Sequence, residues 1–250
     1  FEWDVDVKLN SDGLRDFEIL PKTNFDHRIL ILGDSFTWGY GVEMEDTFSQ
    51  VLENKFKSKG IRLDVINAGV TSYSPMLEYL YLREKGLQYE PDIVILMFDM
   101  SDLQNDHSYQ QSALFENGKL KAVNHEEKIN IFRILLAKSK LAQTLNNLLV
   151  QVDAKYNKAP KLPKAVGEVQ HDRYAITRHE TTFEDEKAYW SRSLKYIGLI
   201  KELSEKNNIK FILSTYPYGH QIHPQEWSQG RHNFGFEIGE VYSDRPEKIL

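Results

Sequence analysis

The chain has 250 residues and a mass of 29.2 kDa, with 41% hydrophobic and 27% charged residues. This composition supports a sizeable core and excludes a disordered or fibrous protein. The length fits one large α/β domain as easily as two smaller ones. The net charge of -6 argues against nucleic acid as a partner, because duplex binding uses basic patches that neutralise phosphates. The absence of cysteine excludes disulfides, Cys-ligated zinc and thiol nucleophiles.

Short apolar runs alternate with longer amphipathic ones in the first hundred residues. We predict buried strands over Arg28–Leu32, Arg62–Asn67 and Asp92–Phe98. Helices over Glu45–Lys59 and Pro75–Gln88 connect them, because apolar residues recur there at helical spacing. Alternation of strand and helix predicts parallel strands joined by right-handed crossovers.

The next convincing strand, Lys210–Thr215, follows only after a long insertion. We expect this insertion, about residues 103–183, to be helical, with a helix over Glu126–Val152 and an exposed loop over Lys155–Val169. Glu184–Asn207 then returns the chain to the sheet as a helix. The prediction is one domain, a three-layer α/β/α sandwich of flavodoxin-like type with a helical insertion between the third and fourth strands.

A serine follows the first predicted strand. Gly33-Asp34-Ser35 begins a turn at the carboxyl edge of the sheet, where open α/β sheets bind their ligands. A serine at such a turn can present both its hydroxyl and its amide to a substrate, as a nucleophile with an oxyanion-binding donor must. The alternative is that Asp34-Ser35 only caps a turn.

Three blocks of this sequence resemble those of the SGNH or GDSL-type esterases and lipases. Leu32-Gly33-Asp34-Ser35-Phe36-Thr37 is similar to the first block, in the longer form found in bacterial members that act on cell-surface carbohydrate esters. Asn67-Ala68-Gly69 is similar to the second block. Asp99-Met100-Ser101-Asp102 aligns with the third, although serine replaces its asparagine and aspartate its glycine.

The resemblance implies a serine ester hydrolase with Ser35 as its nucleophile. The oxyanion would be held by the amides of Ser35 and Gly69 and by the hydroxyl of Ser101. The implied substrate is an O-acyl ester, with O-acetyl expected, on a small molecule or polysaccharide. Hydrolysis and acyl transfer both stay open, and so does a non-catalytic module that binds glycans.

The family's fourth block, Asp-x-x-His, is absent from these 250 residues. We therefore expect a missing C-terminal segment, a base outside this chain and little activity on aryl acetates. His220 and His223 form the one histidine pair that follows the fourth strand at the same edge, and a structural or substrate-contacting role is the favoured interpretation for them.

Three aromatic residues lie near the expected site in the sequence. Trp38, Tyr40 and Tyr73 follow the first two strands, so we expect them to line a pocket, together with His220. The histidine spacing matches no zinc motif, and Gly-x-Gly-x-x-Gly is absent, so neither a metal nor another cofactor is expected.

The compartment and the oligomeric state are not determined by the sequence. No apolar run approaches the ~18 to 20 residues of a membrane span. The chain opens on Phe1 rather than on Met and a basic, then apolar, leader. A trimmed start is expected, compatible with a removed signal or anchor and a bacterial extracytoplasmic location.

Overall fold

The computed structural model describes residues 5–124, 175–178, 183–227, 230–231, 236–242 and 248–250. The helix predicted over Glu126–Val152 and the loop predicted over Lys155–Val169 lie outside these ranges. Within the described ranges, no helix is both long enough and apolar enough to cross a membrane.

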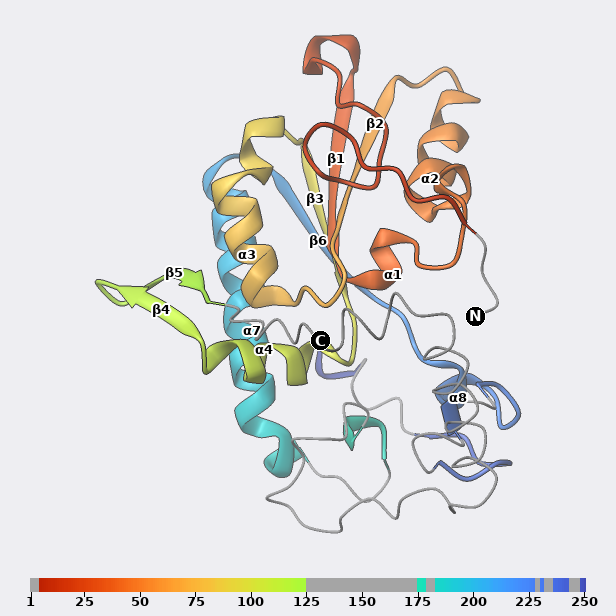
Figure 1. The fold of residues 1–250 in the computed structure, drawn as a ribbon, viewed down its shortest axis with the longest axis vertical. Helices are drawn as coiled ribbons and strands as arrows, with labels where there is room; N and C mark the ends of the chain where they lie inside the picture. The colour runs from red at the N-terminus through yellow and green to blue at the C-terminus, as the bar shows by residue number, and fades with distance from the viewer. Residues whose placement is uncertain (1–4, 125–174, 179–182, 228–229, 232–235, 243–247) are drawn as a thin grey trace, which may run out of the picture.

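A parallel four-stranded sheet forms the centre of the molecule, as predicted (Figure 1). Its spatial order is β2-β1-β3-β6, with every neighbouring pair parallel. The strands are β1 (His27–Gly33), β2 (Leu63–Gly69), β3 (Ile93–Phe98) and β6 (Lys210–Thr215). All four carboxyl ends therefore meet at one edge, which we call the carboxyl edge.

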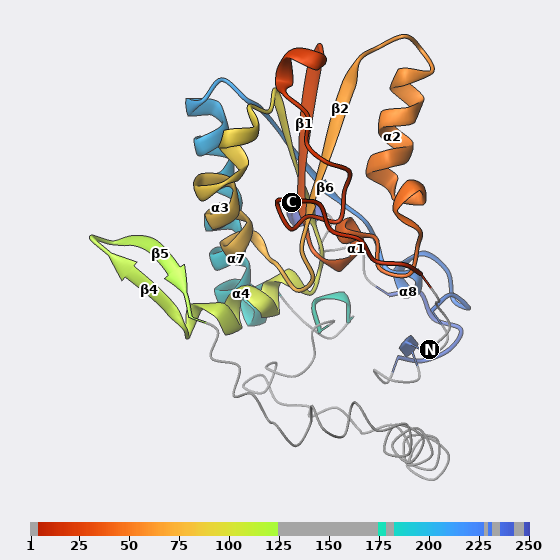
Figure 2. The same ribbon diagram turned by 45° about the horizontal axis from the view of Figure 1, so that its top comes forward.

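Helices cover both faces of the sheet (Figure 2). On one face, α2 (Phe48–Lys57) packs Leu52 and Phe56 against Ile29, Ile31, Leu63 and Val65. The other face is covered by α3 (Pro75–Glu84) and α7 (Phe183–Lys206), and there Leu82, Trp190 and Ile200 join the larger core cluster. The α/β/α layering is the expected one, and it follows from the period-two alternation of strands that are apolar on both faces.

Two of the predicted helices are shorter than expected. α2 begins at Phe48, and a separate 3-10 turn, η2 (Met44–Asp46), precedes it. α3 ends at Glu84, and a further 3-10 turn, η3 (Gly86–Tyr89), follows. At Gly86 an added Cβ would lie 2.8 Å from Leu30 Cδ2, so the glycine lets the chain approach the sheet as the helix ends.

The start of the insertion is not wholly helical, which corrects the prediction. After α4 (Asp102–Gln110), the strands β4 (Ala113–Glu116) and β5 (Lys119–Val123) form an antiparallel hairpin. Its turn is Asn117-Gly118, with φ of 51° and 75°. Asn-Gly between short strands favours this kind of turn, so the sequence did carry the signal for the hairpin.

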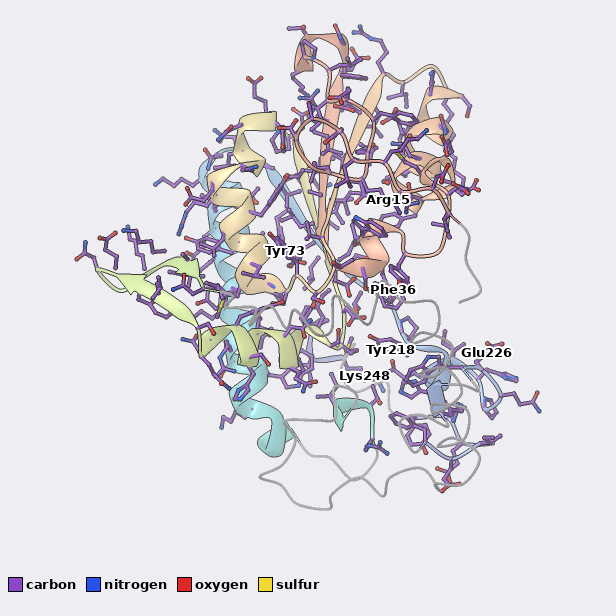
Figure 3. The ribbon with its side chains drawn as sticks, viewed as in Figure 1. Arg15, Phe36, Tyr73, Tyr218, Glu226 and Lys248 are labelled. Carbon is purple, nitrogen blue, oxygen red and sulfur yellow. The ribbon has the colours of Figure 1, made fainter. Side chains whose placement is uncertain are left out.

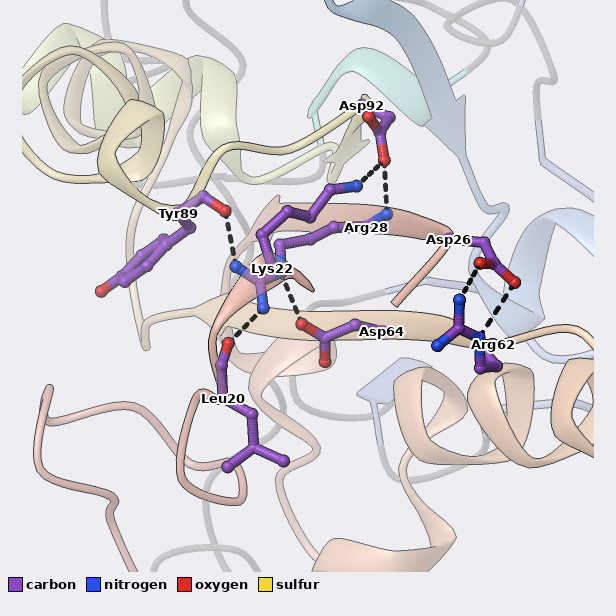
Figure 4. Close-up of polar contacts among 8 residues, drawn as sticks. All are labelled: Leu20, Lys22, Asp26, Arg28, Arg62, Asp64, Tyr89 and Asp92. Carbon is purple, nitrogen blue, oxygen red and sulfur yellow. Dashed lines mark hydrogen bonds and ion pairs between the residues drawn. The ribbon is translucent and has the colours of Figure 1, made fainter. Parts of the chain in front are cut away.

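Polar contacts join the elements at the amino edge of the sheet, opposite the serine (Figure 4). The buried Arg28 side chain donates to Asp64 Oδ2 at 2.5 Å and to the carbonyls of Tyr89 and Leu20. The Arg28 amide donates to Asp92 Oδ2 at 2.6 Å. These bonds fix the amino ends of β1, β2 and β3, so the carboxyl edge is built on a rigid base.

Candidate functional site

Ser35 is the first residue of the short helix α1 (Ser35–Trp38), directly after β1. Asp34 caps this helix, because its Oδ1 accepts the Phe36 amide at 2.9 Å. The half-buried Ser35 donates its hydroxyl hydrogen to Asp34 Oδ2 at 3.4 Å, which is long for such a bond. The capping role weighed from the sequence is therefore real, and it belongs to Asp34, which leaves Ser35 at the carboxyl edge.

The second block packs directly against α1. Gly69 has no Cβ, and an added one would lie 2.4 Å from the Trp38 amide nitrogen. Asn67 Nδ2 donates to the Thr37 carbonyl at 2.8 Å, while Asn67 Oδ1 accepts the Gly69 amide at 3.0 Å. In this conformation the Gly69 amide is bonded to Asn67, so it can donate to an oxyanion only by giving up that bond.

The third block supplies a buried serine, Ser101, and a buried aspartate, Asp99. Ser101 is buried at the start of α4, and its amide donates to Asp99 Oδ1 at 2.6 Å. Asp99 Oδ2 accepts the hydroxyls of Tyr218, at 2.5 Å, and Tyr216, at 3.3 Å. The two tyrosines follow β6, so Asp99 joins the ends of two neighbouring strands.

Carboxyl groups converge beneath Ser35, an arrangement that the sequence analysis missed. Asp34, Asp99 and Asp102 are buried, with one oxygen of each within 4.8 Å of the others. Burial, then the charge of Asp99, raises the pKa of Asp34 to about 6. Burial, and then the charge of Glu78, raise the pKa of Asp102 well above its usual value. Burial, and then the charge of Asp106, raise the pKa of Glu78 in the same way.

Asp106 extends this acidic region between the helices. Its Oδ1 accepts the Ser74 hydroxyl at 2.6 Å and the Met76 amide at 3.0 Å, and its Oδ2 accepts the Ser193 hydroxyl at 2.7 Å. Burial raises its pKa to about 6 despite these bonds. Asp102 and Asp106 are four residues apart, a spacing that places both on one face of α4 and could have indicated the cluster.

Aromatic side chains follow Ser35 in the chain, and Figure 3 labels the first of them, Phe36, together with Tyr218. The Phe36 ring is 52% exposed, and its centroid lies 4.9 Å from that of Tyr216. The rings of Trp38 and Tyr40 lie 6.0 Å apart, with Tyr40 58% exposed. These residues can contact a substrate with aromatic and apolar surface.

Arg15 lies beside α1, and Tyr73 lies in the turn between β2 and α3 (Figure 3). Arg15 Nη1 donates to the carbonyls of Trp38 and Gly39, and its guanidinium lies 4.7 Å from the centroid of the Trp38 ring. Tyr73 is half-buried in the turn after β2. Arg15 thereby fixes the loop that carries Trp38 and Tyr40.

His220 differs from the expected pocket residue. It lies in α8 (Gly219–Ile222) with no exposed surface, its ring 4.7 Å from Trp227 and 4.4 Å from Phe236 by centroids. Its Nε2 is 2.9 Å from Thr177 Oγ1. Burial, and then nearby arginines, lower its pKa to about 4. His220 is thus a neutral core residue rather than part of an accessible pocket.

Comparison with known proteins gives one family match and several distant structural likenesses. A model of the GDSL-like lipase/acylhydrolase family matches residues 31–230. A comparison with curated proteins gives no significant match.

Three solved structures illustrate the likenesses. TesA is 18% identical with a TM-score of 0.30, and the match covers 34% of this chain and 49% of TesA. A two-domain esterase (CEX) active on acetylated mannans is 22% identical with a TM-score of 0.29, covering 37% of this chain and 28% of that one. The psychrotrophic esterase EstA from Pseudoalteromonas sp. is 17% identical with a TM-score of 0.33, covering 75% and 77%.

Proposed function

Because the chain belongs to the GDSL-like lipase/acylhydrolase family, we propose that it is a carboxylic ester hydrolase with Ser35 as its nucleophile. The observation that carries the proposal is the position of Ser35, the first residue of α1 at the carboxyl edge, with its hydroxyl beside Asp34. A nucleophile at a helix start can also use its own amide to stabilise negative charge.

In the proposed reaction, Ser35 Oγ attacks the ester carbonyl carbon and loses its proton. The tetrahedral intermediate collapses, and the alcohol leaves with a proton while the acyl group stays on Ser35. Water then attacks the acyl-enzyme, releasing the carboxylic acid and restoring the serine. The Ser35 amide is the first proposed oxyanion donor. The Ser101 hydroxyl and the Gly69 amide are the others, the latter after release from Asn67.

The proton acceptor has one candidate among the described residues. Asp34 is the one described partner of the Ser35 hydroxyl, and its pKa of about 6 leaves it ionised at neutral pH. If Asp34 accepts the proton, kcat/KM rises with pH around an apparent pKa of about 6. A rise centred elsewhere would show that Asp34 is not the proton acceptor.

For the substrate we propose an O-acyl ester of a carbohydrate, with O-acetyl the preferred acyl group. The exposed or half-buried aromatic side chains of Phe36, Trp38 and Tyr40, which lie in and just after the helix that begins at Ser35, support a ring-shaped alcohol portion. An O-acyltransferase would use the same acyl-enzyme, with a second hydroxyl in place of water. A non-catalytic glycan-binding module is the other candidate, favoured by the serine at position 101 where the family has asparagine.

The test is hydrolysis of p-nitrophenyl acetate and of acetylated polysaccharide by the wild type, Ser35→Ala and Ser58→Ala. Ser58 is exposed at the end of α2, so its variant is the matched control. We expect a low wild-type rate on the aryl acetate, as the sequence indicates, and we expect Ser35→Ala to abolish the turnover of either substrate while Ser58→Ala leaves it unchanged. Binding of the polysaccharide without Ser35-dependent turnover would favour the binding module instead.

A further inference from the structure

The three aspartates beneath Ser35 have the spacing of a cation site. Asp34, Asp99 and Asp102 each offer an oxygen within 4.8 Å of the other two, and none is more than 6% exposed. Three points with that spacing lie within about 2.8 Å of a common centre, close to the ~2.3 to 2.6 Å of calcium–oxygen bonds.

A second observation, independent of this spacing, points to a ligand. Glu78, in the first turn of α3, is 1% exposed, and neither of its carboxyl oxygens has a hydrogen-bond partner among the described residues. Asp102 Oδ1 is also buried and unpartnered within that part of the chain. Glu78 and Asp102 lie on two helices that pack against each other, α3 and α4. The charge of Glu78 is the largest electrostatic cause of the raised pKa of Asp102, after burial.

Most of the other oxygens in the cluster accept hydrogen bonds. Asp34 accepts the Phe36 amide and the Ser35 hydroxyl, Asp102 Oδ2 accepts the Asp99 amide, and Asp99 accepts the Ser101 amide and two tyrosine hydroxyls. A carboxylate oxygen has two lone pairs, so an oxygen that accepts one hydrogen bond can also ligate a cation. No ion pair between described residues involves these four carboxyls. Buried carboxylates without a compensating charge are strongly destabilising, so protons or a cation must neutralise them.

We propose that Asp34, Glu78, Asp99 and Asp102 bind a divalent cation, calcium, beneath Ser35. Calcium accepts many carboxylate oxygens in irregular geometry, whereas magnesium retains several waters and rarely occupies an all-protein cage. The site would join the ends of β1 and β3 to the starts of α3 and α4. Histidine spacing could not reveal it, because every ligand is a carboxylate. A cation on Asp34 would lower the pKa of this carboxyl, so the pH dependence proposed for Ser35 applies to the ion-free protein.

The test uses the full chain dialysed against EDTA and then against chelator-free buffer at about pH 7. Terbium serves as a luminescent calcium probe. Because Tyr218 donates to Asp99, a terbium ion in the cluster will be sensitised by excitation of tyrosine. We expect one terbium per chain, displaced by calcium more readily than by magnesium. Calcium at about a hundredfold excess over Kd will raise the thermal midpoint by roughly 5 to 10 °C.

Isosteric variants locate the site. Glu78→Gln and Asp102→Asn will each lose the calcium-induced shift, while Glu53→Gln, a half-buried carboxyl on the opposite face of the sheet, will retain it. If a cluster variant fails to fold, the Tyr218→Phe variant is used in its place. We expect this variant to bind terbium with unchanged affinity and to give lower terbium emission, because the sensitising tyrosine beside Asp99 is lost. The proposal is overturned if the wild type binds neither terbium nor calcium, or if the cluster variants bind these ions as well as Glu53→Gln does. It is also overturned if the cluster variants are more stable than the wild type without any ion, because that result would show that shared protons neutralise the carboxyls.

Discussion

Asp34 bonds to both the Phe36 amide and the Ser35 hydroxyl, so a single carboxyl fixes the start of α1 and orients the serine. The same carboxyl faces Asp99 and Asp102. At the residue scale, Ser35 therefore lies next to a group of buried carboxyl groups. A change in the protonation or ligation of these carboxyls will affect the position of the Ser35 hydroxyl.

Glu78 gives this acidic group a pH dependence that can be measured. Because its pKa is raised in the folded protein, its contribution to stability is complete below the unfolded value of about 4.5 and is lost as pH rises toward the folded pKa. In chelator-treated buffer, the free energy of unfolding of Glu78→Gln should therefore fall less than that of the wild type between about pH 5 and 7. Urea unfolding across this range measures the slopes. Glu84→Gln, an exposed position on the same helix, is the control, and equal slopes for Glu78→Gln and wild type would contradict the prediction.

His220 should titrate in the opposite sense. Its pKa is lowered to about 4, so its contribution to stability is complete above the unfolded value of about 6.5 and is lost as pH falls toward 4. We expect the His220 ring resonances in an NMR titration to stay those of neutral imidazole down to about pH 5. The exposed His223 is the internal comparison. A midpoint near 6.5 for His220 would show that the aromatic enclosure opens in solution.

At the element scale, α1 lies against β2 because Gly69 leaves room for the backbone of Thr37 and Trp38. Asn67 reinforces this contact through the Thr37 carbonyl. The second block thus has a structural reason for its glycine and asparagine, apart from any oxyanion role.

Gly69→Ala should displace α1, because the new Cβ would meet backbone atoms, which cannot rotate away. We expect a loss of about 1 to 3 kcal/mol of stability and a lower kcat as Ser35 moves. The control is Gly198→Ala in α7, where an added Cβ meets nothing within 4 Å. That variant should gain about 0.5 to 1 kcal/mol. Chemical denaturation of both variants tests the pair, and a neutral Gly69→Ala would show that α1 is not held by this contact.

The sheet was predictable from the sequence, whereas the hairpin and the site's electrostatics were not predicted. β6 begins and ends where expected, because Lys210–Thr215 is a short β-branched and apolar run between polar ends. β4 and β5 were missed because their exposed side chains lack a buried alternation, although Asn117-Gly118 indicated the turn. The carboxyl cluster comes from three separate segments of the chain, around Asp34, Glu78 and Asp99–Asp102, so only the folded sheet brings its members together.

At the scale of the whole molecule, the two edges of the sheet are stabilised by different means. Arg28 neutralises Asp64 and binds carbonyls at the amino edge, while buried acids meet at the carboxyl edge. The amino edge is thus electrostatically compensated, and the carboxyl edge carries the uncompensated charge. Buried groups that destabilise the fold are expected at functional sites, and here such groups are the carboxyls beneath Ser35.

The central claim is that Ser35 is a nucleophile, and covalent labelling tests it most directly. In a fluorophosphonate, serine Oγ displaces fluoride at phosphorus and forms a stable adduct, which peptide mass spectrometry locates. We predict one adduct per chain, on Ser35, in the wild type and in Ser58→Ala, and none in Ser35→Ala. An unlabelled wild type with a cooperative unfolding transition, or an adduct on another residue, would contradict the claim.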